Sequence, residues 1–78
     1  MNHEIEDIRL LNAIREALLH RKEQRKLSYR KLAAAADVEV GTAYNFIKKR
    51  SDITMLNLMK LVRALDFTLI ELLQTSKS

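Results

Sequence analysis

Apolar residues recur every three or four positions along the first quarter of the chain. This stripe runs through Ile5, Ile8, Leu11, Ile14 and Leu18. Such spacing places side chains on one side of an α-helix, and it predicts a helix from about Ile5 to about Lys26. The run from His20 to Lys26 contains no apolar residue, so we expect this end of the helix to be exposed.

Capping residues divide the middle of the chain into three further helices. Ser28 is a good N-cap for a short helix over Tyr29–Ala36, and Asp37 tolerates the left-handed conformation that ends a helix. A third helix is predicted from about Glu39 to about Lys49, and Thr54 can cap a fourth. The side chains expected to point inward from the second and third helices are Leu32, Ala33, Ala36, Ala43, Phe46 and Ile47.

The last part of the chain carries the signature of one more helix start. Thr68 and Glu71 have the spacing of a capping box, which predicts a fifth short helix anchored by Leu72 and Leu73. Residues 74–78 form a polar tail. We therefore expect one all-α domain of five helices spanning residues 1–78, with its core at about 8–73. A single glycine and the absence of proline agree with a helical fold.

The net charge of +4 is unevenly distributed along the chain. Residues 1–20 carry two basic and four acidic side chains, whereas residues 21–49 carry eight basic and three acidic ones. A basic middle third suits a polyanion such as nucleic acid, because phosphate contacts supply most non-specific affinity. A solvated surface that only keeps the protein soluble would look the same in the sequence.

The segment from Leu27 to Ala43 predicts a helix, a tight turn and a second helix. Alanine at position 33 leaves room for the next helix to cross closely, and apolar residues on both helices would set the crossing angle. This arrangement leaves the outer side of the third helix free to enter a DNA major groove.

Two stretches together resemble the phage Cro and repressor family, also called the XRE (xenobiotic-response-element) family. The first is Leu27-Ser28-Tyr29-Arg30-Lys31-Leu32-Ala33, followed by Val38 and by Thr42-Ala43-Tyr44-Asn45-Phe46; the second runs from Thr54 to Leu73. The resemblance covers roughly residues 10–73 and implies a lambda-repressor-like fold. The chain departs from the family pattern at Tyr29, Asp37, Glu39, Ile47 and Lys49, where the family usually has glutamine, glycine, serine, glutamate and glycine.

The resemblance implies a set of DNA-contacting positions. Those facing the groove are Val40, Gly41, Thr42, Tyr44 and Asn45. Positions expected to meet the phosphate backbone are Ser28, Tyr29, Arg30, Lys31, Lys48, Lys49 and Arg50. The chemistry agrees in part, since asparagine can pair with adenine through two hydrogen bonds and lysine or arginine suits phosphate. Tyr44 packed on the second helix and Asn45 as a mere surface residue are the alternatives.

Other classes of function find little support in the residues. His3 and His20 are not paired at metal-ligand spacing, and without cysteine we expect no metal, no cofactor and no enzymatic activity. No apolar stretch approaches the roughly 20 residues needed to span a bilayer, so we expect no membrane partner. The resemblance to the Cro and repressor family implies a cytoplasmic, nucleoid-associated protein of bacterial or phage origin.

We therefore predict a transcriptional regulator that binds a palindromic operator in double-stranded DNA, most simply as a repressor. Dimerisation would use the fourth and fifth helices (Leu69, Ile70, Leu73) or, alternatively, the start of the first helix (Ile5, Ile8). An antitoxin that holds a toxin partner and regulates its own operon is the main alternative. An amphipathic protein lying at a membrane surface is a third, although the apolar residues find a better use in one shared core.

Overall fold

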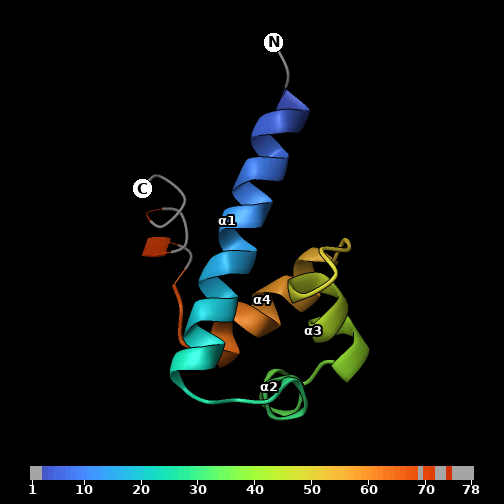
Figure 1. Cartoon of the computed structure of the whole chain (residues 1–78), viewed down its shortest axis with the longest axis vertical. Helices are drawn as coiled ribbons and strands as arrows, with labels where there is room; N and C mark the ends of the chain where they lie inside the picture. The colour runs from blue at the N-terminus through green and yellow to red at the C-terminus, as the bar shows by residue number, and fades with distance from the viewer. Residues whose placement is uncertain (1–2, 69, 72–73, 75–78) are drawn as a thin grey trace.

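The computed structural model describes residues 3–68, 70, 71 and 74, and these contain four helices (Figure 1). The helices are α1 (His3–Gln24), α2 (Tyr29–Ala36), α3 (Val40–Ile47) and α4 (Met55–Ala64). The long α1 runs along the molecule, and the three short helices gather around its C-terminal half. None of the helices in the described part of the chain is long and apolar enough to cross a membrane.

The core lies where α1 meets the three short helices. Leu18, Leu32, Ala43, Phe46 and Leu61 have no exposed surface, although they come from all four helices. The side chains predicted to point inward from α2 and α3 are all buried. Burial of one large apolar side chain contributes about 1.5–3 kcal/mol, so these positions hold the short helices in place.

The caps predicted for the short helices are largely confirmed. The Ser28 hydroxyl accepts from the Lys31 N–H at 3.1 Å, and Thr54 accepts from the Asn57 N–H at 3.1 Å. Glu39 stands at the N-cap of α3, where its side chain makes no capping hydrogen bond. The start of α3 therefore lacks the side-chain acceptor that a serine would supply.

Each helix is followed by a residue with a positive φ, and none of these is glycine. They are Lys26, Asp37, Arg50 and Asp66, with φ between 55° and 60°. This backbone turn explains why α1 ends at Gln24 and α3 at Ile47, each two residues before the predicted limit. A side chain in this conformation costs roughly 1 kcal/mol, which glycine avoids.

Replacing Asp37 with glycine should raise the free energy of unfolding by about 0.5 kcal/mol. Asp37 follows α2 at φ 60° and its N–H bonds to the Ala33 and Ala34 carbonyls, so glycine would keep the turn and remove the strain. The gain is partial because glycine also adds freedom to the unfolded chain. Urea denaturation measures it; an Asp37→Ala control should be less stable than Asp37→Gly, and equal values would contradict the explanation.

The N-terminal part of α1 extends beyond the body formed by the other helices (Figure 1). We call residues 3–12 the arm. Ile5, Ile8 and Leu10 on the arm are 48%, 51% and 37% exposed, whereas Leu18 further along the same helix is completely buried. The predicted apolar stripe thus reaches the core only in its C-terminal half.

Two arginines of α1 bind residues at the C-terminal end of α4. Arg21 donates to the Leu65 carbonyl at 2.8 Å, and its guanidinium lies 3.9 Å from the centre of the Phe67 ring. Arg25 pairs with Asp66 at 3.0 Å. Part of the positive charge predicted for a nucleic-acid surface is therefore used to hold the end of α4, where a cation also complements the helix dipole.

The predicted fifth helix is not confirmed. The reciprocal bonds of its capping box are present, because the Thr68 N–H donates to Glu71 at 2.9 Å and the Glu71 N–H donates to the Thr68 hydroxyl at 3.1 Å. However, Leu69, Leu72 and Leu73 lie outside the described residues, and with them most of the surface predicted for dimerisation. Ile70 is described and is 67% exposed.

Candidate nucleic-acid interface

The close crossing of α2 and α3 forms the base of the candidate interface. Ala33 on α2 is 1% exposed and Ala43 on α3 is fully buried, so each helix contributes a small side chain to the shared core. Val38 in the turn between them packs against the core. The structure therefore has the helix–turn–helix geometry expected from the sequence, with one side of α3 turned outward.

The outer side of α3 carries the residues predicted to face the groove. Val40 is 43% exposed and Tyr44 37%, and Gly41 and Asn45 are exposed as well. Thr42 is half-buried, so it offers less surface than its neighbours. Four of the five positions are thus open on one short helix.

Tyr29 and Tyr44 join the two helices at this surface. Their ring centres are 5.1 Å apart in an edge-to-face arrangement, so Tyr44 both packs on α2 and remains partly open. Burial raises the pKa of the Tyr29 phenol, with smaller contributions from Tyr44 and Glu23. Tyr29 consequently stays protonated at neutral pH and keeps an O–H that can donate to a phosphate oxygen.

Lysine 22 is a cation at this surface that the sequence analysis did not select. Its Nζ lies 4.1 Å from the centre of the Tyr29 ring. The sequence showed it only as one of several charges near the end of α1, and its place beside Tyr29 depends on how α1 meets α2. A lysine held over an aromatic ring is positioned without losing its charge.

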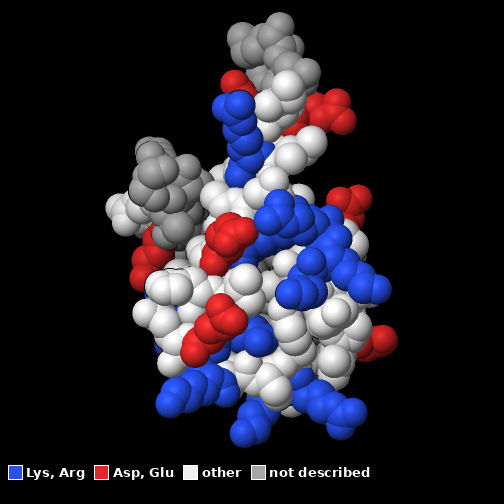
Figure 2. Space-filling view, in the orientation of Figure 1, with Lys and Arg blue, Asp and Glu red and all other residues white. Residues whose placement is uncertain are grey.

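The predicted phosphate-binding cations lie at both ends of the α2–α3 unit. Arg30 and Lys31 are exposed in the first turn of α2, and Lys48, Lys49 and Arg50 are exposed just after α3. Figure 2 shows basic side chains gathered over the lower and right-hand parts of the body, with acidic ones on the projecting arm. Arg50 also pairs with Glu16 at 3.3 Å, an exposed pair worth little in water.

A polar hollow of about 350 Å³ adjoins the outer side of α3. It is lined by Gly41, Thr42 and Asn45 together with residues of the α3–α4 link and the start of α4, and it contains the carboxylates of Glu39 and Asp52 but no lysine or arginine. A phosphate would be repelled there. The acidic hollow borders Gly41, Thr42 and Asn45, so phosphates are expected at the cations that flank the α2–α3 unit and not beside these three residues.

Arg15 holds the C-terminal end of α3 in place, and the sequence analysis did not select it. It is 6% exposed and donates to the Phe46 carbonyl at 2.9 Å, to the Arg50 and Ser51 carbonyls at 2.9 Å each, and to Asn12 at 2.8 Å. Its guanidinium also lies 4.7 Å from the centre of the Phe46 ring.

No carboxylate forms an ion pair with Arg15 in the described part of the chain. Burial lowers the pKa of Arg15, the charge of Arg50 lowers it further, and Asp52 acts in the opposite direction. The guanidinium remains charged and is stabilised by carbonyl oxygens in place of an acid. Because those carbonyls end α3 and begin the link that follows, Arg15 positions the helix that carries the candidate contacts.

Comparison of the chain with models of known protein families agrees with this geometry. A family model described as helix-turn-helix matches residues 18–72. No curated protein and no solved structure matches the chain. The matched range contains α2, α3 and α4 in full, whereas the arm and Arg15 lie before it.

Proposed function

The chain belongs to the helix-turn-helix family of Cro-like and repressor-like (XRE) proteins, and from this premise we propose that it represses transcription by binding an operator. In this proposal α3 enters the major groove, and Asn45 and Tyr44 reach the base edges. Cations at both ends of the α2–α3 unit contact phosphates. The observation that carries the proposal is the open side of α3 with cations flanking it.

The operator is proposed to be palindromic and the protein to bind it as a homodimer whose interface includes α4. Two half-sites about one helical turn apart give an affinity that a single small module lacks. Met55 and Met59 on α4 are 70% and 47% exposed, so this helix carries apolar surface that a second subunit would cover.

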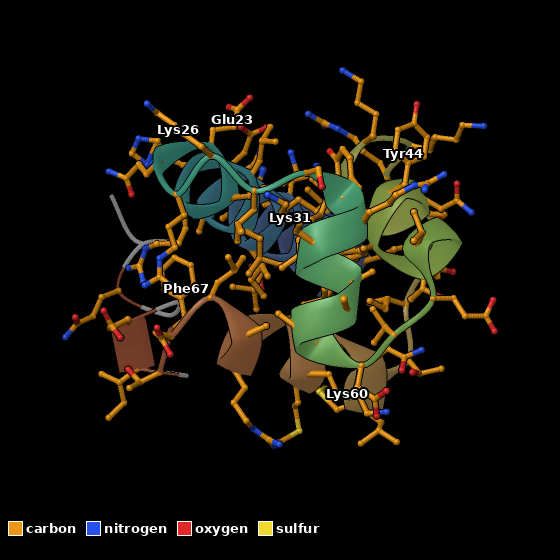
Figure 3. The ribbon with its side chains drawn as sticks, turned by 90° about the horizontal axis from the view of Figure 1, so that it is seen from below. Glu23, Lys26, Lys31, Tyr44, Lys60 and Phe67 are labelled. Carbon is orange, nitrogen blue, oxygen red and sulfur yellow. The ribbon has the colours of Figure 1, made fainter. Side chains whose placement is uncertain are left out.

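Selection of bound sequences from random DNA, followed by gel-shift measurements, tests the proposal. Asn45→Ala and Lys48→Ala should each weaken binding to the selected operator, by at most about 3 kcal/mol. The melting temperature of each variant should change little, because both side chains are exposed. Lys60→Ala is the control for loss of one positive charge, since Figure 3 places Lys60 and Tyr44 at opposite edges of the molecule and Lys60 makes only a long, exposed hydrogen bond of 3.4 Å to the Asp37 carbonyl. Unchanged binding by both variants would count against the assignment.

Gly41→Ala should have opposite effects on stability and on DNA binding. The φ of Gly41 is not positive, and an added Cβ would find only the Asn45 amide nitrogen, at 4.0 Å. Alanine should therefore raise the free energy of unfolding by about 0.5 kcal/mol, since glycine weakens a helix. On the DNA side the added methyl group would separate α3 from the groove.

Thermal melting and gel-shift titration of Gly41→Ala measure the two effects separately. Ala35→Gly, an exposed change in α2, is the control that lowers stability without touching the proposed contacts. A Gly41→Ala protein that binds the operator as tightly as the parent would rule out a close approach of the backbone at this position.

The antitoxin hypothesis uses the same open apolar surface of α4. A toxin covering Met55 and Met59 would protect them in the same way as a second subunit. It predicts a chain that is monomeric alone and forms a stable complex with the product of an adjacent gene, whereas the repressor proposal predicts a dimer without any partner.

A further inference from the structure

An apolar groove lies between α1 and α4, away from the candidate DNA interface. It has a volume of about 240 Å³, and its lining is Ile14, Met55, Leu58, Met59, Val62, Arg63 and Phe67. Arg63 is the one charged residue at its edge. None of the lining residues belongs to α2 or α3, so an object in the groove leaves α3 open.

The arm, in contrast to the groove, is a projecting segment. Residues 3–12 stand out from the body as helix, and three large apolar side chains on them are between 37% and 51% exposed. A helical segment of this length has little stability without a surface to pack on. Ile5, Ile8 and Leu10 are not among the described side chains that pack against the core, and the arm lies before the part matched by the family model.

The charges of the arm and the groove are complementary. The arm carries Glu4, Glu6 and Asp7 against a single base, Arg9. Helix α4 carries Lys60 and Arg63 and no acidic residue. Of these two cations, Arg63 lines the groove. A second copy of the chain therefore offers apolar side chains to cover the apolar groove and negative charge that Arg63 attracts.

We propose that two copies of this chain form a symmetric dimer in which the arm of each lies in the groove of the other. The contact is isologous, so each pair of subunits makes it twice. The proposal deepens the dimer named under the proposed function, but it concerns association of the protein alone. It is therefore tested without DNA, and its failure would leave operator binding by a monomer or by another dimer untouched.

Sedimentation equilibrium of the full chain, at concentrations up to about 100 µM, measures the association. The wild-type chain should be a dimer at the upper end of this range. The arm variant, Ile5→Ser with Ile8→Ser, and the groove variant, Met59→Lys, should each raise the dissociation constant about 100-fold, because a tenfold loss occurs at both contacts. Both sets of side chains are substantially exposed, so circular dichroism should show an intact fold.

Leu56→Lys is the matched control for the groove. Leu56 is 63% exposed on the same helix but does not line the groove, so this variant should dimerise like the wild type. A monomeric wild-type chain would overturn the proposal. So would loss of the dimer in Leu56→Lys to the same degree as in Met59→Lys.

Mixing the two defective variants separates arm-to-groove docking from other dimers. A heterodimer of the arm variant and the groove variant keeps one unaltered contact, formed by the intact arm of one chain and the intact groove of the other. The other contact joins two altered surfaces, and either alteration alone already abolishes it. The mixed dimer therefore loses one contact where each variant dimer loses two, and its dissociation constant should lie about tenfold above that of the wild type. A groove variant that dimerises normally by itself, or a mixture that stays monomeric, would show that arm and groove do not meet.

Discussion

Replacing Arg15 with methionine should lower the free energy of unfolding by about 3 kcal/mol or more, the largest effect we expect from a single residue outside the apolar core. Arg15 donates to three carbonyls of α3 and the following link, and the Phe46 carbonyl among them is bound in a buried hydrogen bond. Methionine fills similar space but donates no hydrogen bond. The carbonyls would then lose their partners, at a cost of about 1–3 kcal/mol for each one that water cannot reach.

Chemical denaturation of Arg15→Met measures this loss, and Arg9→Met is the control. Arg9 is exposed on the same helix, so its replacement should change the free energy of unfolding by less than about 0.5 kcal/mol. Arg15→Lys keeps the charge and should recover only part of the stability, because one ammonium group cannot span the acceptors that the guanidinium reaches. A loss below about 1 kcal/mol in Arg15→Met would contradict this account of α3.

Raising the salt concentration from about 50 to about 200 mM should weaken the binding of one subunit to its half-site about 500-fold. This value follows from about five phosphate contacts and a slope of about −0.9 per contact in a plot of log affinity against log salt. The contacts are those of Arg30, Lys31, Lys48, Lys49 and Arg50, all of them exposed. Arg21 and Arg25 are left out because they bind the end of α4.

Gel-shift titrations at four or more salt concentrations give the slope directly. Lys48→Ala should reduce its magnitude by about 0.9, whereas Lys60→Ala, at the opposite edge of the molecule, should leave it unchanged. A slope close to zero would show that the basic surface does not meet phosphates. If Lys60→Ala lowered the slope as much as Lys48→Ala does, the DNA would not be bound specifically at the α2–α3 surface.

The hydrogen bonds of α1 explain why the charge distribution overestimated the DNA-binding surface. The sequence placed Arg21 and Arg25 among the basic residues of the middle third, but the fold turns both toward the end of α4. Their partners lie 44 and 41 positions away in the chain. A count of charges along the sequence carries no information on which of them the fold uses internally.

Features that depend on neighbouring residues were determined by the sequence itself. The bounds of α2, the caps at Ser28 and Thr54 and the left-handed turn at Asp37 each involve residues no more than four positions apart, and they formed as predicted. The inward positions of α2 and α3 followed from helical periodicity for the same reason.

Only the tertiary structure decided which apolar and charged side chains of α1 are covered. The stripe from Ile5 to Leu18 has one composition throughout, yet its first half stands free and its second half forms the core, because the short helices pack only against the latter. Arg15 likewise acquires its role from carbonyls 31 to 36 positions away. Short-range patterns specify the helices, whereas contacts across the fold specify which surfaces remain open for DNA and for a second chain.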